Sequence, residues 1–243
     1  MSEKEKVIKF YEKNAYCYEE KRFATSRGRY EDGIQKEIAF GLSSWQNLEI
    51  LEVGCGTGRF SIEALKWVKN IVALDPSLSM LKKLKEKINT NMDRIELVQG
   101  SGYELPFKDN SFDGCICINV LNHLPQVHKV FVEIHRILKP KAFFIFNFPN
   151  LQSLLLPVGL LINWRKNSLK NPVYTKWYTL KEIKSNLQST GFRIEMIKGV
   201  FLPPIGIIPF PVVRKLNKLS RDSALKYISA NVFIKAIADK REV

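Results

Sequence analysis

The sequence has few cysteines and histidines, and neither type is spaced as a metal site or a disulfide framework requires. Its four cysteines, Cys17, Cys55, Cys115 and Cys117, contain no C-x-x-C pair, and its three histidines form no H-E-x-x-H motif. These absences argue against a bound metal and against a small disulfide-stabilised fold. We expect buried, reduced thiols.

The sequence also has no apolar run long enough to cross a membrane. The longest such run in its second half, residues 151–164, is interrupted by Pro157 and Gly159, and it is shorter than the roughly 20 residues that a spanning helix needs. The first ten residues, MSEKEKVIKF, are charged and lack the apolar core of a secretory signal. We therefore predict a cytoplasmic protein.

Acidic residues are scarce in the last part of the chain. Residues 151–243 hold 16 Lys and Arg against 5 Asp and Glu, whereas residues 1–150 are nearly balanced, and the whole chain carries a net charge of +14. A positive field concentrates anionic partners. The pattern is compatible with an anionic small substrate, with RNA or with an anionic membrane surface, and charge that serves solubility explains it equally well.

Short apolar runs alternate along most of the chain with segments whose apolar residues recur at helical spacing. This alternation is typical of a doubly wound α/β sheet. We predict strands at residues 48–53, 70–75, 94–99, 112–119, 142–148, 192–200 and 227–237. We predict helices at 60–68, 77–89, 127–138 and 179–190, two helices within residues 1–45, and a basic helix before the last strand. Ser77 or Ser79 could cap one helix, and Thr179 with Glu182 forms a capping box for another.

The first predicted strand ends in a glycine-rich turn, Glu52-Val-Gly54-Cys-Gly56-Thr-Gly58. Glycines between a strand and a helix let the backbone approach a ligand, and the helix that follows favours negative charge. A nicotinamide dehydrogenase would place its third glycine at position 59. The spacing G-x-G-x-G favours a different nucleotide-like cofactor, and Asp75 at the end of the second strand can accept hydrogen bonds from ribose hydroxyls.

Four segments, ILEVGCGTGRF, VALDPSLSML, ELPFKDNSFD and VLNHL…EIHRILKP, follow one another in this order. Over about residues 11–200 the chain resembles class I S-adenosylmethionine-dependent methyltransferases, in particular the branch with ubiquinone and menaquinone biosynthesis enzymes. The resemblance implies a Rossmann-like, seven-stranded, mostly parallel sheet whose last strand is antiparallel. It also implies one domain, 1–243, with a helical cap (1–46), a cofactor-binding core (47–150) and substrate-lid additions (151–178 and 200–226).

The resemblance assigns the cofactor, S-adenosyl-L-methionine, to the glycine turn, with S-adenosyl-L-homocysteine as product. Glu52 and the backbone of Gly54, Gly56 and Gly58 would hold its methionine end and ribose. Asp75 would accept hydrogen bonds from the two ribose hydroxyls.

The same resemblance assigns other residues to the adenine and the methyl group of the cofactor. Pro76 and Ser77 would lie beside the adenine, and Asn119 near the methyl group. Ser101 and Gly102 stand where the family often has Asp and Ala, and they would lie at the adenine. Ser101 can accept one hydrogen bond but carries no charge, so adenine recognition is weaker than in the family or comes from the backbone. A further departure, Lys139-Pro-Lys-Ala142 in place of Lys-Pro-Gly-Gly, affects a turn.

The N-terminal segment commonly covers the cofactor in this family, so Tyr11, Tyr16 and Tyr18 become candidates to face the sulfonium, and Tyr18 is the one we assign to the cofactor site. Packing on the sheet is the alternative for at least two of them. Methyl transfer requires alignment and, for a hydroxyl or acidic carbon, a general base. His123 is the candidate base or substrate-orienting residue.

The acceptor is expected to be a small molecule, hydrophobic or anionic, such as a quinone precursor, a lipid or a sugar. The apolar segments 151–171 and 200–213, flanked by basic residues, suggest that it is reached at an anionic membrane surface. An ordinary lid over a soluble acceptor is the alternative. RNA is a less favoured acceptor, although aromatics near the basic tail could stack bases, and a non-catalytic cofactor-binding protein stays open.

Overall fold

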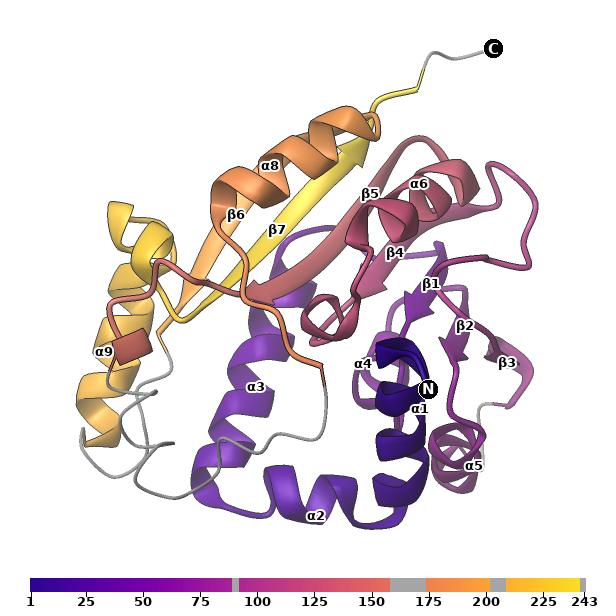
Figure 1. Ribbon diagram of the computed structural model, residues 1–243, viewed down its shortest axis with the longest axis horizontal. Helices are drawn as coiled ribbons and strands as arrows, with labels where there is room; N and C mark the ends of the chain where they lie inside the picture. Colours follow the sequence, from indigo (N-terminus) through magenta and orange to yellow (C-terminus); the bar gives the residue numbers. More distant parts are fainter. Residues whose placement is uncertain (89–91, 158–173, 202–208, 241–243) are drawn as a thin grey trace.

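The computed structural model describes residues 1–88, 92–157, 174–201 and 209–240, and its centre is a seven-stranded sheet of order β3-β2-β1-β4-β5-β7-β6 (Figure 1). The strands are β1 (Glu49–Val53), β2 (Asn70–Asp75), β3 (Ile95–Gln99), β4 (Phe112–Cys117), β5 (Leu138–Pro149), β6 (Phe192–Val200) and β7 (Asn231–Ala238). All neighbouring strands pair in parallel except β7, which is antiparallel to both β5 and β6. The predicted Rossmann-like fold with an antiparallel last strand is confirmed.

Helices cover both faces of this sheet. The α-helices are α1 (Glu3–Asn14), α2 (Tyr18–Phe23), α3 (Ser26–Gly41), α4 (Arg59–Ala64), α5 (Leu78–Lys87), α6 (Val127–Ile137), α8 (Leu180–Ser189) and α9 (Phe210–Ser220). Short 3-10 helices are η1 (Ala15–Cys17), η2 (Met92–Arg94), η3 (Leu121–His123) and η4 (Ala224–Ile228). None of the helices within the described ranges is long and apolar enough to cross a membrane.

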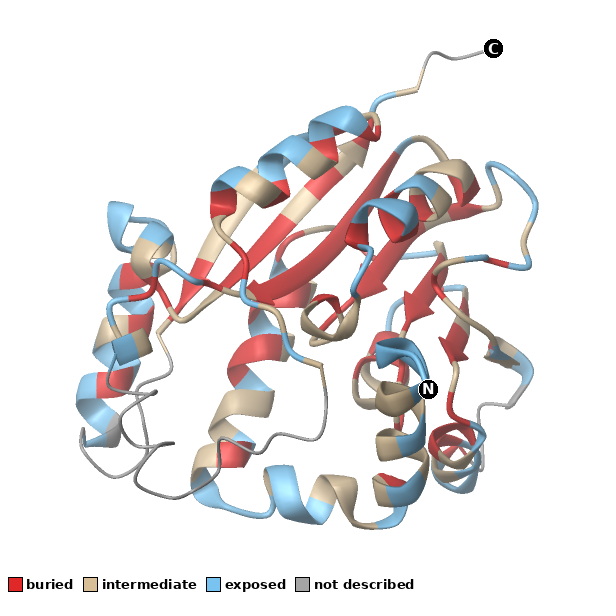
Figure 2. Ribbon diagram, in the orientation of Figure 1, coloured by how far each residue is buried: buried red, intermediate tan, exposed pale blue. Residues whose placement is uncertain are grey.

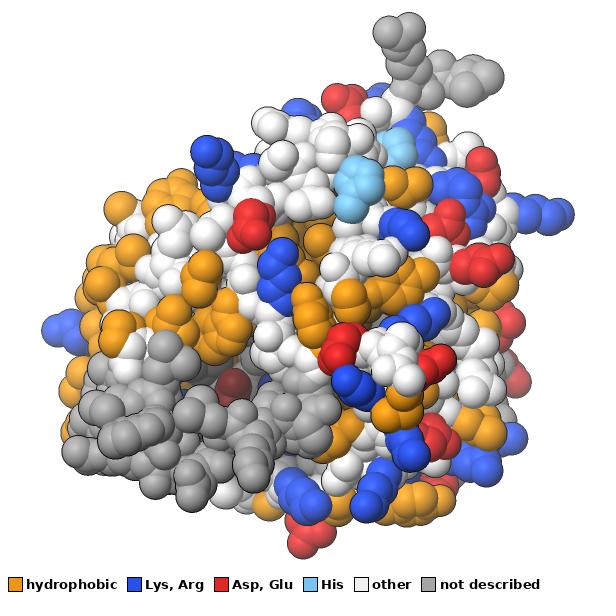
Figure 3. Space-filling view, in the orientation of Figure 1, with side chains coloured by type: hydrophobic (Ala, Val, Ile, Leu, Met, Phe, Trp, Pro, Cys, Tyr) orange, Lys and Arg blue, Asp and Glu red, His pale blue; other side chains and the backbone are white. Residues whose placement is uncertain are grey.

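Two hydrophobic clusters, one on each face of the sheet, hold these layers together, and Figure 2 shows the buried residues concentrated along the central strands. On one face α6 and α8 pack against the Phe144, Phe146 and Phe148 side chains of β5. On the other face α3, α4 and α5 cover β1 and β2. Because both faces are covered, the central strands are nearly all apolar, as their sequence indicated. Hydrophobic side chains are also visible on the outer surface, on the left of Figure 3.

Capping side chains set the starts of two helices, α5 and α8, as predicted. Ser77 caps α5, since its side chain accepts a hydrogen bond from the Met80 backbone N–H at 3.2 Å. Thr179 and Glu182 form both hydrogen bonds of the capping box at the start of α8. Gly191, with φ of 82°, follows the end of that helix.

Other boundaries differ from the prediction. The N-terminal region holds three α-helices and a 3-10 turn rather than two helices, and α4 ends at Ala64 instead of Val68. The last strand begins at Asn231, because Ser223 caps the 3-10 helix η4 just before it. The predicted lid additions fall partly on residues 158–173 and 202–208, which lie outside the described residues.

Candidate functional site

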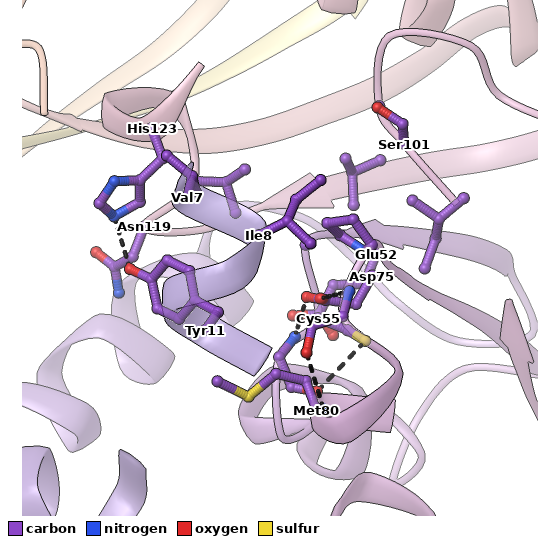
Figure 4. Close-up of a pocket in the computed structure, with 18 of the residues that line it drawn as sticks. Val7, Ile8, Tyr11, Glu52, Cys55, Asp75, Met80, Ser101, Asn119 and His123 are labelled. Atoms are coloured by element: carbon purple, nitrogen blue, oxygen red, sulfur yellow. Dashed lines mark hydrogen bonds between the residues drawn. The ribbon is translucent and has the colours of Figure 1, made fainter. Parts of the chain in front are cut away.

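A pocket opens at the carboxyl ends of β1, β2 and β4. It lies at the point where the strand order reverses, between β1 and β4. Open α/β sheets bind ligands at this position, because the loops that leave the two neighbouring strands turn in opposite directions. The fold therefore places the glycine turn, Asp75 and Asn119 around one cavity (Figure 4).

The glycine turn brings its backbone to the edge of the pocket. Gly56 has φ of 54°, and its N–H donates to Asp75 Oδ2 at 2.8 Å. A Cβ on Gly56 would meet nothing within 4 Å. Gly58, with φ of 83°, serves another purpose: a Cβ there would lie 2.1 Å from Leu84 Cδ1, so it lets α4 pack on α5.

Two buried carboxyl groups face the pocket. Glu52 is 2% exposed and accepts a hydrogen bond from the Ser61 hydroxyl. Burial raises the pKa of Glu52 to about 7. Asp75 is 7% exposed, and its carboxylate accepts from the Ser77 and Gly56 backbone N–H groups. Burial also raises the pKa of Asp75, to about 6, against the effect of these hydrogen bonds. Both groups favour a ligand that brings positive charge or hydroxyl donors.

Asn119 is held in an unusual backbone conformation at the end of β4. Its φ is 60°, which costs about 1 kcal/mol or more for a residue other than glycine. Asn147 of β5 stabilises it by a reciprocal pair of hydrogen bonds: the Asn119 N–H donates to Asn147 Oδ1 at 2.6 Å, and Asn147 Nδ2 donates to Asn119 Oδ1 at 3.0 Å. Asn119 Nδ2 then donates to Gln35 Oε1, which links it to Arg59. No pattern in the sequence indicated Asn147 or Gln35 as site residues.

Helix α1 lies over the pocket and contributes Val7, Ile8 and Tyr11 to its wall (Figure 4). Glu12 of the same helix ties α1 to the start of α5. Its carboxylate accepts from the Ser79 backbone N–H at 3.1 Å, from the Ser79 hydroxyl at 2.7 Å and from the Ser77 hydroxyl. A carboxylate at this end of α5 also interacts favourably with the helix dipole. Hydrogen bonds to Glu12 thus hold α1 over the pocket, and sequence spacing did not indicate them.

His123 forms a chain of hydrogen bonds at the rim of the pocket. Its Nδ1 lies 2.9 Å from the Tyr174 carbonyl oxygen. A carbonyl can only accept, so Nδ1 carries the proton and Nε2 is the acceptor. The Tyr11 hydroxyl therefore donates to Nε2, at 2.8 Å, and Asn122 Nδ2 lies 2.9 Å from the same nitrogen. Burial lowers the pKa of His123 and raises that of Tyr11, which keeps both groups neutral.

Most of the predicted site residues line this one pocket. They are Tyr18, Glu52, Gly54, Gly56, Asp75, Pro76, Ser77, Ser101, Gly102, Asn119 and His123. Gly58 is not among the lining residues and instead supports helix packing. Tyr16 is 67% exposed and lies beside Lys83, away from the pocket, whereas Tyr11 and Tyr18 line it.

The chemistry of this lining fits S-adenosylmethionine. The cofactor carries a sulfonium and an ammonium group, two ribose hydroxyls and an adenine. Glu52 and Asp75 supply buried negative charge near the glycine turn, and Tyr11 and Tyr18 supply aromatic faces, which stabilise cations. Met80 and Leu74 supply apolar wall. These residues would hold the cofactor.

Comparison with known proteins also indicates a methyltransferase. A family model described as a methyltransferase domain matches residues 51–146. An uncharacterized protein of Methanocaldococcus jannaschii is 30% identical over 213 residues, which cover 79% of this chain and 78% of that protein. The ubiquinone biosynthesis O-methyltransferase of Rickettsia akari is 26% identical over 181 residues, 72% of this chain and 71% of that enzyme. A SAM-dependent methyltransferase of Thermotoga maritima shares the fold, with a TM-score of 0.70 at 20% identity over 96% of this chain and 100% of that one.

The matched domain contains the glycine turn, Asp75 and Asn119, the same residues that the fold gathers around the pocket. The glycine spacing and the methyltransferase match together argue against a nicotinamide-dependent dehydrogenase. The chain belongs to the class I S-adenosylmethionine-dependent methyltransferases, and S-adenosylmethionine is its cofactor.

Proposed function

We propose that this enzyme methylates a small, largely apolar acceptor that loses a proton in the reaction, and that the Tyr11–His123 pair receives this proton. The observation that carries the proposal is the 2.8 Å hydrogen bond from the Tyr11 hydroxyl to His123 Nε2 at the pocket. The two residues are 112 positions apart in sequence, so the fold has brought together a hydroxyl and a base at the expected methyl-transfer site.

The pair can accept a proton through a hydrogen bond that already exists. S-adenosylmethionine, when bound, supplies a methyl group that the positive sulfur already activates. An acceptor hydroxyl or acidic carbon that donates to Tyr11 Oη can pass its proton to that oxygen while the Tyr11 proton moves to His123 Nε2. The resulting imidazolium keeps its Nδ1–H bond to the Tyr174 carbonyl. Because burial lowers the pKa of His123, the ring is neutral and able to accept at neutral pH.

The walls near the pair favour a small apolar acceptor. Val7, Ile8 and Leu124 line the pocket beside Tyr11 and His123. Helix α1 lies across the same opening, and a compact molecule fits under it more readily than a stacked nucleic-acid strand. The Rickettsia akari relative is named for O-methylation in ubiquinone biosynthesis, which supports a quinone precursor or a similar phenolic compound as the acceptor class.

The acceptor class can be tested by supplying purified enzyme and methyl-labelled S-adenosylmethionine to a fractionated cell extract. Label would be counted in organic-soluble, aqueous small-molecule, RNA and protein fractions. The proposal predicts label in the organic-soluble fraction. An Asp75→Asn variant, which weakens the cofactor site, is the control and should lower that label. Label in RNA or protein would contradict the proposal.

A further inference from the structure

The outer surface around α9 combines exposed apolar side chains with unbalanced positive charge. The described residues hold twelve large hydrophobic side chains that are exposed, and six of them lie in two neighbouring stretches of chain. These six are Leu151, Leu154, Val212, Leu219, Leu225 and Tyr227. We refer to them, with the basic residues Arg214, Lys215, Lys218 and Lys226, as the α9 surface.

The two stretches lie side by side in the fold. The Leu154 N–H donates to the Ile228 carbonyl at 3.2 Å, and Asn150 Nδ2 donates to the Tyr227 carbonyl at 2.8 Å. Helix α9 in turn packs against η4. Hydrophobic side chains gather on this side of the molecule in Figure 3. The exposed apolar residues therefore form one region rather than scattered single positions, which would need no explanation.

Helix α9 is held to the protein partly by polar side chains, while apolar ones face outward. Asn217 and Ser220 are buried: Asn217 Oδ1 accepts from the Phe201 N–H at 2.6 Å, and Asn217 Nδ2 donates to the Tyr30 hydroxyl at 3.0 Å. Val212 and Leu219, seven residues apart and hence on one face of the helix, are 46% and 51% exposed. A surface helix usually buries its apolar residues. Helix α9 buries Val213 in this way, but it leaves Val212 and Leu219 exposed, so these outward apolar residues call for a partner.

The charge of this region identifies that partner. Residues 209–230 carry five Lys and Arg and one acidic residue, Asp222, which pairs with Lys198 of β6. Arg221 is paired with Glu37, and Arg214, Lys215 and Lys218 are exposed around the apolar residues. Apolar side chains interleaved with Lys and Arg match the boundary between the headgroups and acyl chains of an anionic bilayer.

We propose that the α9 surface docks on a membrane that contains anionic lipids. This inference does not depend on the identity of the methyl acceptor. The surface is also linked to the pocket by backbone contacts: the Leu151 N–H donates to the Tyr178 carbonyl, and Tyr178 follows four residues after Tyr174, whose carbonyl accepts from His123. Docking here would bring the rim of the pocket near the lipid surface.

Vesicle flotation of the full-length protein tests the proposal. Vesicles of phosphatidylcholine alone would be compared with vesicles in which about a third of the lipid is phosphatidylglycerol. The wild type should float with the anionic vesicles and stay with the soluble fraction when phosphatidylcholine is used alone. Binding to both vesicle types alike, or to neither, would overturn the proposal.

Matched variants separate the apolar and the basic contributions. Val212→Ser with Leu219→Ser should lower the bound fraction about tenfold or more, since two apolar side chains no longer enter the membrane. The apolar control is Val132→Ser, at an exposed valine on α6, and it should bind like the wild type.

Lys215→Glu with Lys218→Glu should weaken binding by about fivefold or more for each position. Its control, Lys181→Glu with Lys184→Glu, changes exposed lysines of α8. All four variants should keep the wild-type melting temperature, because the changed side chains are exposed. Three results would refute membrane docking. The first is an equal loss of vesicle binding in the control variants, and the second is a dimer in sedimentation that dissociates in Leu219→Ser. The third is RNA binding that needs the lysines but not the apolar residues.

Discussion

The buried carboxyl of Glu52 makes cofactor binding depend on pH. Its pKa is about 7, because burial disfavours the charged form, whereas a positively charged cofactor stabilises that form. Between about pH 5 and pH 7 the dissociation constant for S-adenosylmethionine should therefore fall by up to about a hundredfold, or tenfold per pH unit. Asp75, with a pKa of about 6, adds to the slope only at the acidic end.

The free protein should become less stable over the pH range in which its affinity for the cofactor rises. A carboxyl whose pKa is raised from 4.5 in the unfolded chain to about 7 in the fold binds its proton more tightly when folded. Its ionisation therefore opposes folding. The contribution of Glu52 to the free energy of unfolding should fall by up to about 3 kcal/mol as the pH rises from about 4.5 to about 7, and stay level above.

Glu52→Gln isolates this effect. The variant should lose the part of the decrease in stability that Glu52 causes, so that only the decrease from Asp75, below about pH 6, is left. It should bind the cofactor weakly at every pH, with a slope only below about pH 6, again from Asp75. Urea unfolding and isothermal titration calorimetry at four pH values measure both quantities. Glu86→Gln, at a side chain that is 56% exposed, is the control. A pH-independent dissociation constant in the wild type, or an unchanged slope in Glu52→Gln, would show that the ionisation of Glu52 does not govern cofactor binding.

Three further predictions concern the fold and the supports of the site. Lys141→Gly should raise the free energy of unfolding by about 1 kcal/mol in urea denaturation, because Lys141 has φ of 62°; a decrease would contradict this. Asn147→Leu should lower it by about 1 to 3 kcal/mol, since the N–H and the Oδ1 of Asn119 lose their hydrogen-bond partner, and thermal unfolding checks the loss. Glu12→Gln should speed cofactor dissociation about threefold or more in stopped-flow, because α1 is held less firmly over the pocket; an unchanged rate would show that α1 does not retain the cofactor.

The sequence predicted best those features that local physics decides. The glycine turn, the Ser77 cap and the capping box of Thr179 and Glu182 depend on residues within a few positions of one another, and each was found where expected. The order of alternating strands and helices, with buried parallel strands as apolar runs, was sufficient to predict the sheet. The antiparallel last strand came from the family resemblance.

The sequence could not indicate partners that only the tertiary fold brings together. Asn147 reads as a polar interruption in an apolar strand, yet it holds Asn119 in place. Tyr11 was one of three tyrosine candidates, and helical periodicity could not show that it faces His123 while Tyr16 faces solvent. The start of the last strand was misplaced because the hydroxyl of Ser223 stabilises a 3-10 helix in an otherwise apolar segment.

The rate of methyl transfer at saturating cofactor shows whether Tyr11 and His123 take the acceptor proton. Labelled S-adenosylmethionine and the organic-soluble extract fraction would be given to the wild type, Tyr11→Phe, His123→Gln and the control Tyr16→Phe. We predict that Tyr11→Phe and His123→Gln lower the rate by about a hundredfold or more, while their cofactor dissociation constants stay within about threefold of the wild type and Tyr16→Phe is unaffected. Wild-type rates in Tyr11→Phe and His123→Gln would mean that neither residue takes the proton.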